Sequence, residues 1–284
     1  MRKELKDRKN WLTFAVFKAI NVLAVRSRFE HVRFIGRENI PQSGPFLLVS
    51  NHISRWDGLV LHEAIERPSN WMVTPNELTG LQGLVLRSMG AFPADATFRL
   101  IDFVRAQAAK GEGTVIFPEG NVFYDAVTHP FKNGAARLAL SCATVGIPLT
   151  LVPAAVHYGN NGRTATVIVG EPVDLPAYVK EYIEQSNVGI RSLTSRLYRE
   201  VCHLRHSLGV QADNLILFTG SRKKRWVPRL FGAKSDERAS MIGDNERKES
   251  VGCAECVGAS PITGRRLLPF QDGSHNRSRP QEPA

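Results

Sequence analysis

The chain has 284 residues, of which 43% are hydrophobic, so it can bury one sizeable core but is short for two full domains. Its formal net charge is +10, and the excess is confined to the two ends. Residues 1–30 carry eight Lys and Arg against three Asp and Glu, residues 220–284 carry thirteen against eight, and residues 31–219 carry sixteen of each. A nucleic-acid-binding domain carries its positive charge on the folded surface, so the neutral centre argues against that class and favours basic ends that touch anionic lipid.

The cysteine pattern favours a reducing compartment and predicts no metal site. Cys142 and Cys202 fall in helical-looking segments, and Cys253 and Cys256 form a lone C-x-x-C. A zinc site needs a second pair or nearby histidines, and only His275 follows this motif. We therefore expect no metal and no other cofactor.

A basic amphipathic helix is the first element that the sequence predicts. The segment 11–25 (WLTFAVFKAINVLAV) contains Lys18 and Asn21 on one helix face, so it is too short and too polar for a membrane span. Lys18 and the following Arg26 and Arg28 also disfavour a signal peptide. We expect this helix to lie in a membrane interface, where its basic and aromatic side chains suit an anionic leaflet: Arg2, Lys3, Lys6, Arg8, Lys9, Trp11, Phe14 and Phe17. Packing of the helix on the protein core is the alternative.

Strands and helices alternate from residue 31 to residue 215. Apolar runs predict strands at 31–36, 46–50, 71–74, 114–117, 149–156 and 166–170. Helical periodicity predicts helices at 58–66, 78–89, 98–110 and 134–145, and a helical stretch at 176–208 with a break near Gly189. This order implies an α/β fold with a largely parallel central sheet flanked by helices, and an active site beyond the carboxyl ends of the strands. We therefore expect three parts: a membrane-associating helix (1–30), the α/β domain (31–215) and a basic tail with little order (216–284).

A histidine and an aspartate follow the strand at 46–50. The strand leads directly into the segment 51–57 (NHISRWD), which puts His52 and Asp57 at its carboxyl end. Residues five apart in a helix point away from each other, so this pair meets only across a strand-to-helix turn. There Asp57 can hold the Nδ1 proton of His52 and leave Nε2 to accept a proton from a hydroxyl. The alternative is that both residues only cap the following helix.

Two later strands carry further candidates. The strand that ends at Phe117 runs into Pro118-Glu119-Gly120, which places another carboxylate in a turn at the same end of the sheet. Pro153 interrupts the apolar strand at 152–156 (VPAAV). Because a central strand tolerates proline poorly, this strand either lines an acyl-binding wall or lies at the edge of the sheet.

The order of these motifs resembles the lysophosphatidate (1-acylglycerol-3-phosphate) acyltransferase family. The resemblance covers roughly residues 31–175 and rests on an ordered set of motifs: GRENIP at 36–41, GP at 44–45, N-H-x-x-x-x-D at 51–57, FPEG at 117–120, FKNGAA at 131–136 and VPAAV at 152–156. Each motif alone is unspecific, but the ordered set is specific.

The resemblance implies an enzyme that moves a fatty acyl group directly from acyl-CoA or acyl carrier protein to the hydroxyl of a lysophospholipid acceptor in phospholipid biosynthesis. It assigns His52 as general base and Asp57 as its orienting partner. Further residues are expected to bind substrate: Asn51, Glu119, Gly120 and Pro153. We expect a peripheral protein on the cytoplasmic face of a membrane, with no nucleic acid among its partners.

The sequence departs from the family where a phosphate would bind. The family usually follows FPEG with Thr and Arg, whereas this chain has Asn121 and Val122. Bidentate Arg is the natural partner of a phosphomonoester, so a phosphorylated acceptor needs other cations here. The candidates are Arg55, Arg99 and Lys132. A phosphate-free lysolipid or alcohol acceptor is the alternative for an enzyme, and a non-catalytic lipid-binding relative is the alternative to an enzyme.

Overall fold

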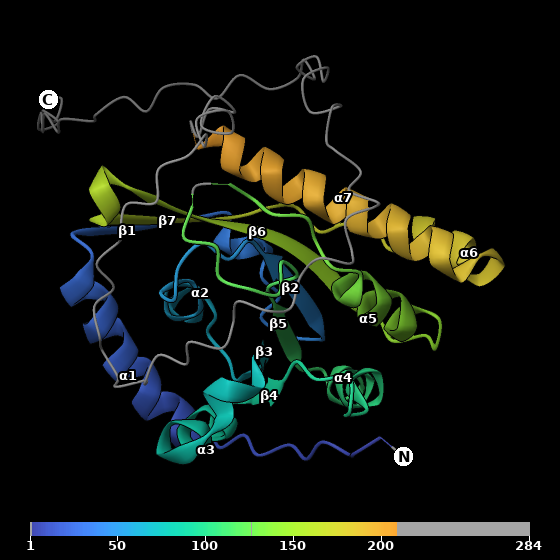
Figure 1. Ribbon diagram of the computed structural model, residues 1–284, viewed down its shortest axis with the longest axis horizontal. Helices are drawn as coiled ribbons and strands as arrows, with labels where there is room; N and C mark the ends of the chain where they lie inside the picture. The colour runs from blue at the N-terminus through green and yellow to red at the C-terminus, as the bar shows by residue number, and fades with distance from the viewer. Residues whose placement is uncertain (1, 126, 209–284) are drawn as a thin grey trace, which may run out of the picture. The chain divides into compact units, whose positions relative to one another are not determined.

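The computed structural model describes residues 2–125 and 127–208, which fold around a seven-stranded sheet (Figure 1). The strands are β1 (His31–Ile35), β2 (Phe46–Ser50), β3 (Ser69–Val73), β4 (Ala91–Pro93), β5 (Gly113–Ile116), β6 (Thr150–Gly159) and β7 (Thr164–Val169). The α-helices are α1 (Trp11–Arg28), α2 (Asp57–Ala64), α3 (Gly80–Ser88), α4 (Leu100–Ala109), α5 (Gly134–Ala143), α6 (Pro176–Glu184) and α7 (Ser186–Ser207). The basic tail predicted at 216–284 lies outside the described residues.

The sheet is largely parallel, as the alternation of elements predicts. Its strand order is β1-β7-β6-β2-β5-β3-β4, and neighbouring strands run parallel except for the antiparallel pair β6 and β7. Strands β2 to β6 therefore all point the same way. Since β5, β2 and β6 are direct neighbours, the segments that follow their carboxyl ends meet at one edge of the sheet.

Helices cover both faces of the sheet, and the strands separate two apolar clusters. In β2, Leu47 and Val49 pack on one side with residues of α4, α5 and α7, whereas Phe46 and Leu48 pack on the other side with residues of α1 and α2. Figure 1 shows α5 and α7 on one side of the sheet and α1 and α2 on the other. The alternation of side chains along a strand explains why consecutive apolar residues in β2 are all buried.

Strand β6 is an interior strand although it contains Pro153. It lies between β2 and β7, so the alternative of an edge strand is wrong. Proline is tolerated because the pairing of β6 with β7 only begins at this point. The Pro153 carbonyl accepts a hydrogen bond from Gly170 N at 2.8 Å, and the regular register starts with Ala154 and Val169.

The C-terminal helical stretch divides at Gln185 and not near Gly189 as predicted. Gln185 has extended backbone angles (φ −143°, ψ 91°) between α6 and α7. Gly189 lies inside α7, where an added Cβ would come within 2.6 Å of Tyr182 N. This glycine therefore permits close packing of α6 against α7 and does not end a helix. The three-residue strand β4 is not predicted by the sequence.

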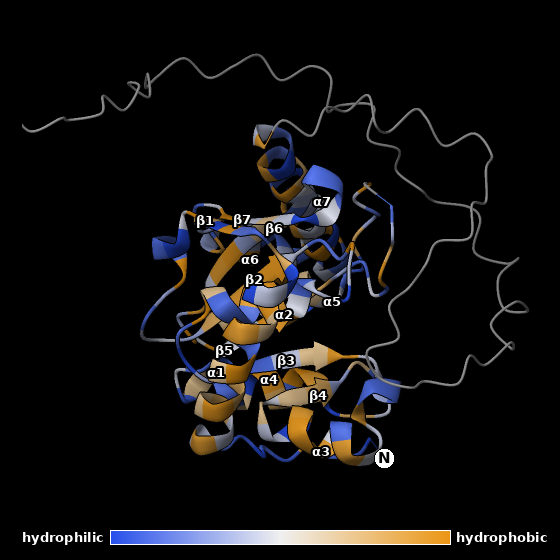
Figure 2. Ribbon diagram, turned by 90° about the vertical axis from the view of Figure 1, so that its left-hand side faces the viewer, coloured by the Kyte–Doolittle hydropathy of each residue, from blue (hydrophilic) through white to orange (hydrophobic). Residues whose placement is uncertain are grey.

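Helix α1 packs one face on the protein and exposes an apolar face. Phe14, Asn21 and Val25 are buried, and Asn21 Nδ2 donates a hydrogen bond to Leu59 O at 2.9 Å beside α2. The polar Asn21 thus lies on the packed side. Apolar side chains lie on the exposed side: Trp11, Leu12, Val16, Ile20 and Leu23. Figure 2 shows orange, hydrophobic segments along the α1 ribbon. None of the described helices is both long enough and apolar enough to cross a membrane.

Some side chains expected at a membrane face the protein instead. Lys9 Nζ lies 2.5 Å from Glu112 Oε2 and 2.9 Å from Asp7 Oδ1, and its side chain is almost fully buried. The rings of Phe14 and Phe17 lie 5.2 and 5.3 Å from the His62 ring. The interfacial prediction is wrong for Lys9 and Phe14, whose own side chains are buried, and the half-buried Phe17 packs on His62 as well.

Candidate active site

Three neighbouring strands bring the candidate residues together. His52 and Asp57 follow β2, Glu119 follows β5, and Tyr158 lies near the carboxyl end of β6. Because adjacent strands are about 4.8 Å apart, side chains from these three ends can contact one another. The sequence predicts this edge of the sheet for the first three residues but not for Tyr158.

His52 and Asp57 form the hydrogen-bonded pair that their spacing predicts. His52 Nδ1 lies 2.9 Å from Asp57 Oδ2, and Asp57 is the first residue of α2. The same oxygen accepts hydrogen bonds from Ile53 N at 2.7 Å and Ser54 N at 2.8 Å, which fixes the turn between β2 and α2. An ionised carboxylate can only accept, so Nδ1 carries the proton and Nε2 keeps a free lone pair.

Tyr158 completes the environment of the Asp57 carboxylate. Its hydroxyl donates to Asp57 Oδ1 at 2.7 Å, so both oxygens of this fully buried carboxylate have partners. Burial raises the pKa of Tyr158 well above its usual value, and the charge of Asp57 raises it further. The Tyr158 ring also stacks on Phe29, with centroids 5.4 Å apart and an interplanar angle of 16°. Asp57 is therefore held rigidly, as an orienting partner must be.

The His52 ring remains accessible from one side. It stacks on Phe117 with centroids 4.1 Å apart and an interplanar angle of 17°, and 19% of the His52 side chain is exposed to solvent. A substrate hydroxyl can thus approach the His52 ring, whose orientation is fixed by Phe117 and Asp57.

Glu119 joins two segments of the site through its carboxylate. Its Oε1 accepts a hydrogen bond from His52 N at 2.9 Å, and its Oε2 accepts one from His129 N at 3.3 Å. Burial raises the pKa of Glu119 to about 7, while the two backbone hydrogen bonds and the charge of Arg205 lower it. In this structure Glu119 holds the backbone around the base, and its predicted contact with an acceptor stays a prediction.

Asn51 and Gly120 shape the backbone on either side of His52. Asn51 is fully buried; its Nδ2 donates to Val156 O at 3.0 Å and its Oδ1 accepts from Val156 N at 2.8 Å, so it ties the end of β2 to β6. Gly120 has φ +70°, a conformation that glycine adopts without strain. A Cβ there would lie 2.6 Å from Lys132 Nζ, so the Lys132 ammonium group packs directly on this turn.

The structure separates the three cations expected to bind a phosphate. Arg55 is exposed, and its Nε donates to Tyr124 OH at 3.1 Å across the loop that follows Glu119. Arg99 follows β4, three strands or about 14 Å from β2. It pairs with Asp102 at 2.6 Å and with Glu4 at 3.6 Å. Arg55 and Lys132 therefore border the site, whereas Arg99 is engaged elsewhere.

Pro153 lies on the face of the sheet that α7 covers. Its Cγ and the Cδ1 of Leu204 both lie 3.1 Å from the place where a Cβ of Gly170 would be. Its ring is buried among protein atoms, and its proposed contact with an acyl chain stays a prediction.

A second His–Asp pair lies in the loop after Glu119 and is not predicted by the sequence. His129 Nε2 lies 3.0 Å from Asp125 Oδ2, and the His129 ring stacks on Phe123 with centroids 3.6 Å apart. Phe123 N donates to His52 O at 2.9 Å, which places this loop against the catalytic turn. Within residues 2–125 and 127–208, no group of three or more His, Cys, Asp or Glu side chains could hold a metal ion.

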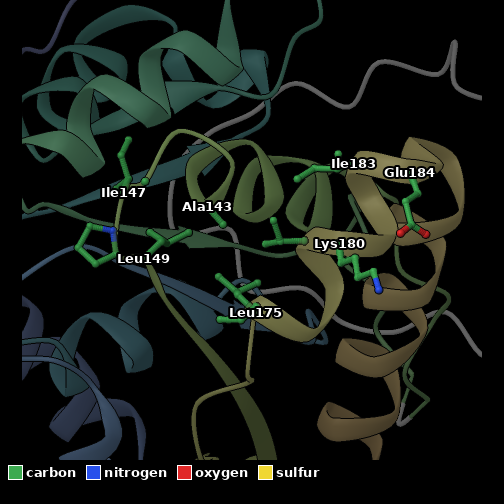
Figure 3. A pocket seen from close by; sticks show the side chains of 11 residues that line it. Ala143, Ile147, Leu149, Leu175, Lys180, Ile183 and Glu184 are labelled. Atoms are coloured by element: carbon green, nitrogen blue, oxygen red, sulfur yellow. The ribbon is translucent and has the colours of Figure 1, made fainter.

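A surface groove of about 630 Å³ lies at the opposite edge of the sheet (Figure 3). It is formed by the end of α5, the loop 146–149 and helix α6, with Ile147, Leu149 and Ile183 among its apolar lining. The loop precedes β6, whereas His52 follows the parallel neighbour β2. The groove is therefore not part of the candidate active site.

The fold and the site together define an α/β domain with a hydrogen-bonded His–Asp pair at the carboxyl edge of its sheet. A model of the Acyltransferase family matches residues 31–157, a range that contains His52, Asp57 and Glu119. Residues 31–157 therefore resemble this acyltransferase family, and the predicted resemblance to its 1-acylglycerol-3-phosphate acyltransferases is confirmed.

Curated relatives and a solved structure agree with this assignment. The 1-acyl-sn-glycerol-3-phosphate acyltransferase alpha of Mus musculus is 22% identical, over 67% of this chain and 78% of that protein. The protein of the same name from Homo sapiens is 24% identical, over 50% of this chain and 59% of that protein. The crystal structure of the 1-acyl-sn-glycerophosphate acyltransferase PlsC from Thermotoga maritima shares the fold, with a TM-score of 0.56 and 18% identity over 70% of this chain and 80% of that one.

Proposed function

We propose that the protein transfers a fatty acyl group from a thioester donor, acyl-CoA or acyl carrier protein, to the hydroxyl of 1-acylglycerol-3-phosphate. The observation that carries this proposal is the His52–Asp57 pair, whose Nδ1–Oδ2 distance is 2.9 Å within the residues that resemble the acyltransferase family. The names of the relatives supply the acceptor, and the resemblance to the family implies the thioester donor.

In the proposed reaction His52 Nε2 accepts the proton of the acceptor hydroxyl while its oxygen attacks the thioester carbonyl. The tetrahedral intermediate then collapses, the C–S bond breaks, and the protonated His52 returns the proton to the leaving thiolate. Asp57 stabilises the imidazolium that forms between these two steps. No acyl-enzyme is needed, because the attacking oxygen comes from the acceptor itself.

Arg55 and Lys132 are the cations that we assign to the acceptor phosphate. Both side chains border the loop that carries Val122 in place of the family's usual Arg, and Lys132 Nζ packs on Gly120. Arg99 is not assigned, since Asp102 and Glu4 pair with it. An acceptor without phosphate is the second candidate, which the apolar Val122 favours.

Thiol release from acyl-CoA with a panel of acceptors tests this proposal. We expect transfer to lysophosphatidate, and an increase in its KM for the double variant Arg55→Ala, Lys132→Ala. Arg99→Ala is the matched control and should leave KM unchanged. Equal KM values for lysophosphatidate and monoacylglycerol, in the wild type and in every variant, would contradict a phosphate site. If neither acyl-CoA nor acyl carrier protein donates an acyl group to any acceptor, the enzyme assignment is contradicted.

We also propose that the exposed faces of α1 and α3 bind a membrane surface. Asn10 N donates to Ser88 O at 2.9 Å, which joins the start of α1 to the end of α3. Large apolar side chains on both helices face outward: Trp11, Leu12, Val16, Ile20, Leu23, Leu81, Leu84 and Val85. Figure 2 shows orange, hydrophobic segments along the ribbons of both helices. The basic residues that precede α1, apart from the buried Lys9, favour the anionic leaflet on the cytoplasmic side of a membrane as the partner.

Sedimentation with vesicles that contain anionic phospholipid tests the membrane surface. Leu12→Asp together with Leu23→Asp should weaken binding, because each places a charge in the apolar face. Ser27→Asp is the matched control, since it adds an acid to an exposed position of the same helix without removing apolar area. Equal binding of wild type and the double variant would contradict the assignment of this face.

A further inference from the structure

Helix α7 places a buried arginine beneath the candidate active site. Arg205 lies in the last turn of α7, and only 4% of it is exposed. It falls outside residues 31–157, the range that the family model matches. The sequence signals only a basic residue near a helix end, and the catalytic mechanism proposed above does not use it.

Arg205 and Tyr198 both donate hydrogen bonds to Thr128, a residue of the loop that follows Glu119. Arg205 Nη1 donates to Thr128 Oγ1 at 2.6 Å, and Tyr198 OH donates to Thr128 O at 3.2 Å. Residues seven apart lie on the same face of a helix, so both donors project from one side of α7. Thr128 is itself buried, with 7% exposed.

The contact at Thr128 continues to the catalytic base. The next residue, His129, donates its backbone N–H to Glu119 Oε2, and Glu119 Oε1 accepts the backbone N–H of His52. Backbone and side-chain hydrogen bonds thus connect α7 to His52 through one carboxylate.

We propose that Arg205 is a positioning residue for acyl transfer, which holds Thr128 in place so that the Glu119 carboxylate binds the neighbouring His129 amide and the His52 amide together. The inference rests on the proposed function, because it gives His52 the role of base. A protonated Glu119 would hold the two amides more weakly, because it has lost its negative charge and its hydroxyl oxygen is a poorer acceptor than a carboxylate oxygen.

The charges around Glu119 support this role. Burial raises its pKa to about 7, the charge of Asp57 raises it as well, and the charge of Arg205 lowers it together with the two backbone amides. The acidic groups and thiol that interact electrostatically with Arg205 are Glu119, Cys202, Asp125 and Asp57. Without the Arg205 guanidinium, the groups that still favour the charged form of Glu119 are the neutral backbone amides of His52 and His129.

Titration of the His52 and His129 amides by ¹H–¹⁵N NMR tests the proposal without any substrate. In the wild type both amide signals should shift with a midpoint of about 7 as Glu119 titrates. Arg205→Met should raise this midpoint by about one pH unit or more, and Arg205→Lys should keep it near the wild-type value because the charge remains. Arg199→Met, an exposed position on the same helix, is the matched control and should not move it.

Acyl transfer gives the second readout. With the higher midpoint, the ionised fraction of Glu119 at pH 7 falls from about one half to about one tenth, so kcat in Arg205→Met should fall about fivefold and recover at higher pH. KM for the donor should stay unchanged. If Arg205→Met does not fold, Thr128→Val serves instead, with a shifted His129 amide signal and a lower kcat as the expected result.

Two outcomes would overturn the proposal: equal amide midpoints in wild type and Arg205→Met, or wild-type amide shifts and kcat in Thr128→Val. A raised midpoint in a protein whose wild type transfers no acyl group would contradict the proposed function while supporting the electrostatic interaction of Arg205 with Glu119. The two failures are therefore distinguishable.

Discussion

Substitution of Asp57 by asparagine separates its role in orienting His52 from its role in the fold. In Asp57→Asn the remaining oxygen can still accept from Ile53 N and Ser54 N, and the new amide can donate to Tyr158 OH. His52 Nδ1 keeps a neutral partner and loses a charged one. Hydrogen bonds to charged groups contribute about 1.5–3 kcal/mol and neutral ones about 0.5–1.5 kcal/mol. The variant therefore loses about 1–2 kcal/mol of transition-state stabilisation, which lowers kcat by about 5–30-fold.

Asp57→Ala is the contrasting variant. It leaves the Ile53 and Ser54 amides and the Tyr158 hydroxyl without their acceptor, at a cost of about 1–3 kcal/mol for each unpaired buried donor. We expect urea unfolding to show a clear loss of stability in Asp57→Ala and little loss in Asp57→Asn, with kcat measured by thiol release at saturating substrates. A kcat of Asp57→Asn within twofold of the wild type, at unchanged stability, would refute the pairing as the source of catalysis.

Three further predictions concern stability. Burial raises the pKa of Glu119 to about 7, above the value of about 4.3 in an unfolded chain, so the folded state keeps a proton that the unfolded state loses. The free energy of unfolding should therefore fall as pH rises from about 4.3 to about 7, by up to about 3 kcal/mol, and Glu119→Gln should flatten this slope in urea titrations at pH 5 and pH 8. Gly120→Ala should lower the free energy of unfolding by about 1–2 kcal/mol, because alanine is strained in the left-handed backbone conformation at this position. The new Cβ also comes close to Lys132, so adding Lys132→Ala should restore stability only in part. Full restoration would contradict the backbone strain. Asn51→Leu leaves both backbone groups of Val156 unpaired at a buried position and should cost about 2–5 kcal/mol, and an unchanged Tm would contradict that bonding pattern.

The parallel sheet and the His52–Asp57 pair follow from local patterns in the sequence. Apolar strands such as β2 stand out as short runs, and the turn that brings together residues five apart is forced by the change from strand to helix. The carboxyl ends of parallel strands then place Glu119 beside this pair. Each step uses neighbours in sequence or a rule about sheets, so no long-range information is needed.

The parts that the sequence does not predict depend on contacts between distant segments. Tyr158 and Arg205 reach Asp57 and Thr128 only through the tertiary arrangement of β6 and α7. Lys9 illustrates the opposite error: a basic residue before an amphipathic helix suggests lipid, but Glu112 from a distant segment binds it in the interior. Periodicity identifies the apolar face of α1, yet only the packing of α1 on α2 tells which face remains exposed.

The most direct test of the account is the turnover of His52→Ala. As a general base, His52 should contribute about 10²–10⁴-fold to the rate, so the variant should lose at least a hundredfold in kcat for transfer from acyl-CoA to lysophosphatidate. His52 is partly exposed, its backbone hydrogen bond to Glu119 survives in the variant, and Asp57 Oδ2 keeps the Ile53 and Ser54 amides as donors, so the free energy of unfolding should stay close to that of the wild type. A variant that folds normally and transfers acyl groups within a few-fold of the wild-type rate would contradict the assignment of His52 as the base.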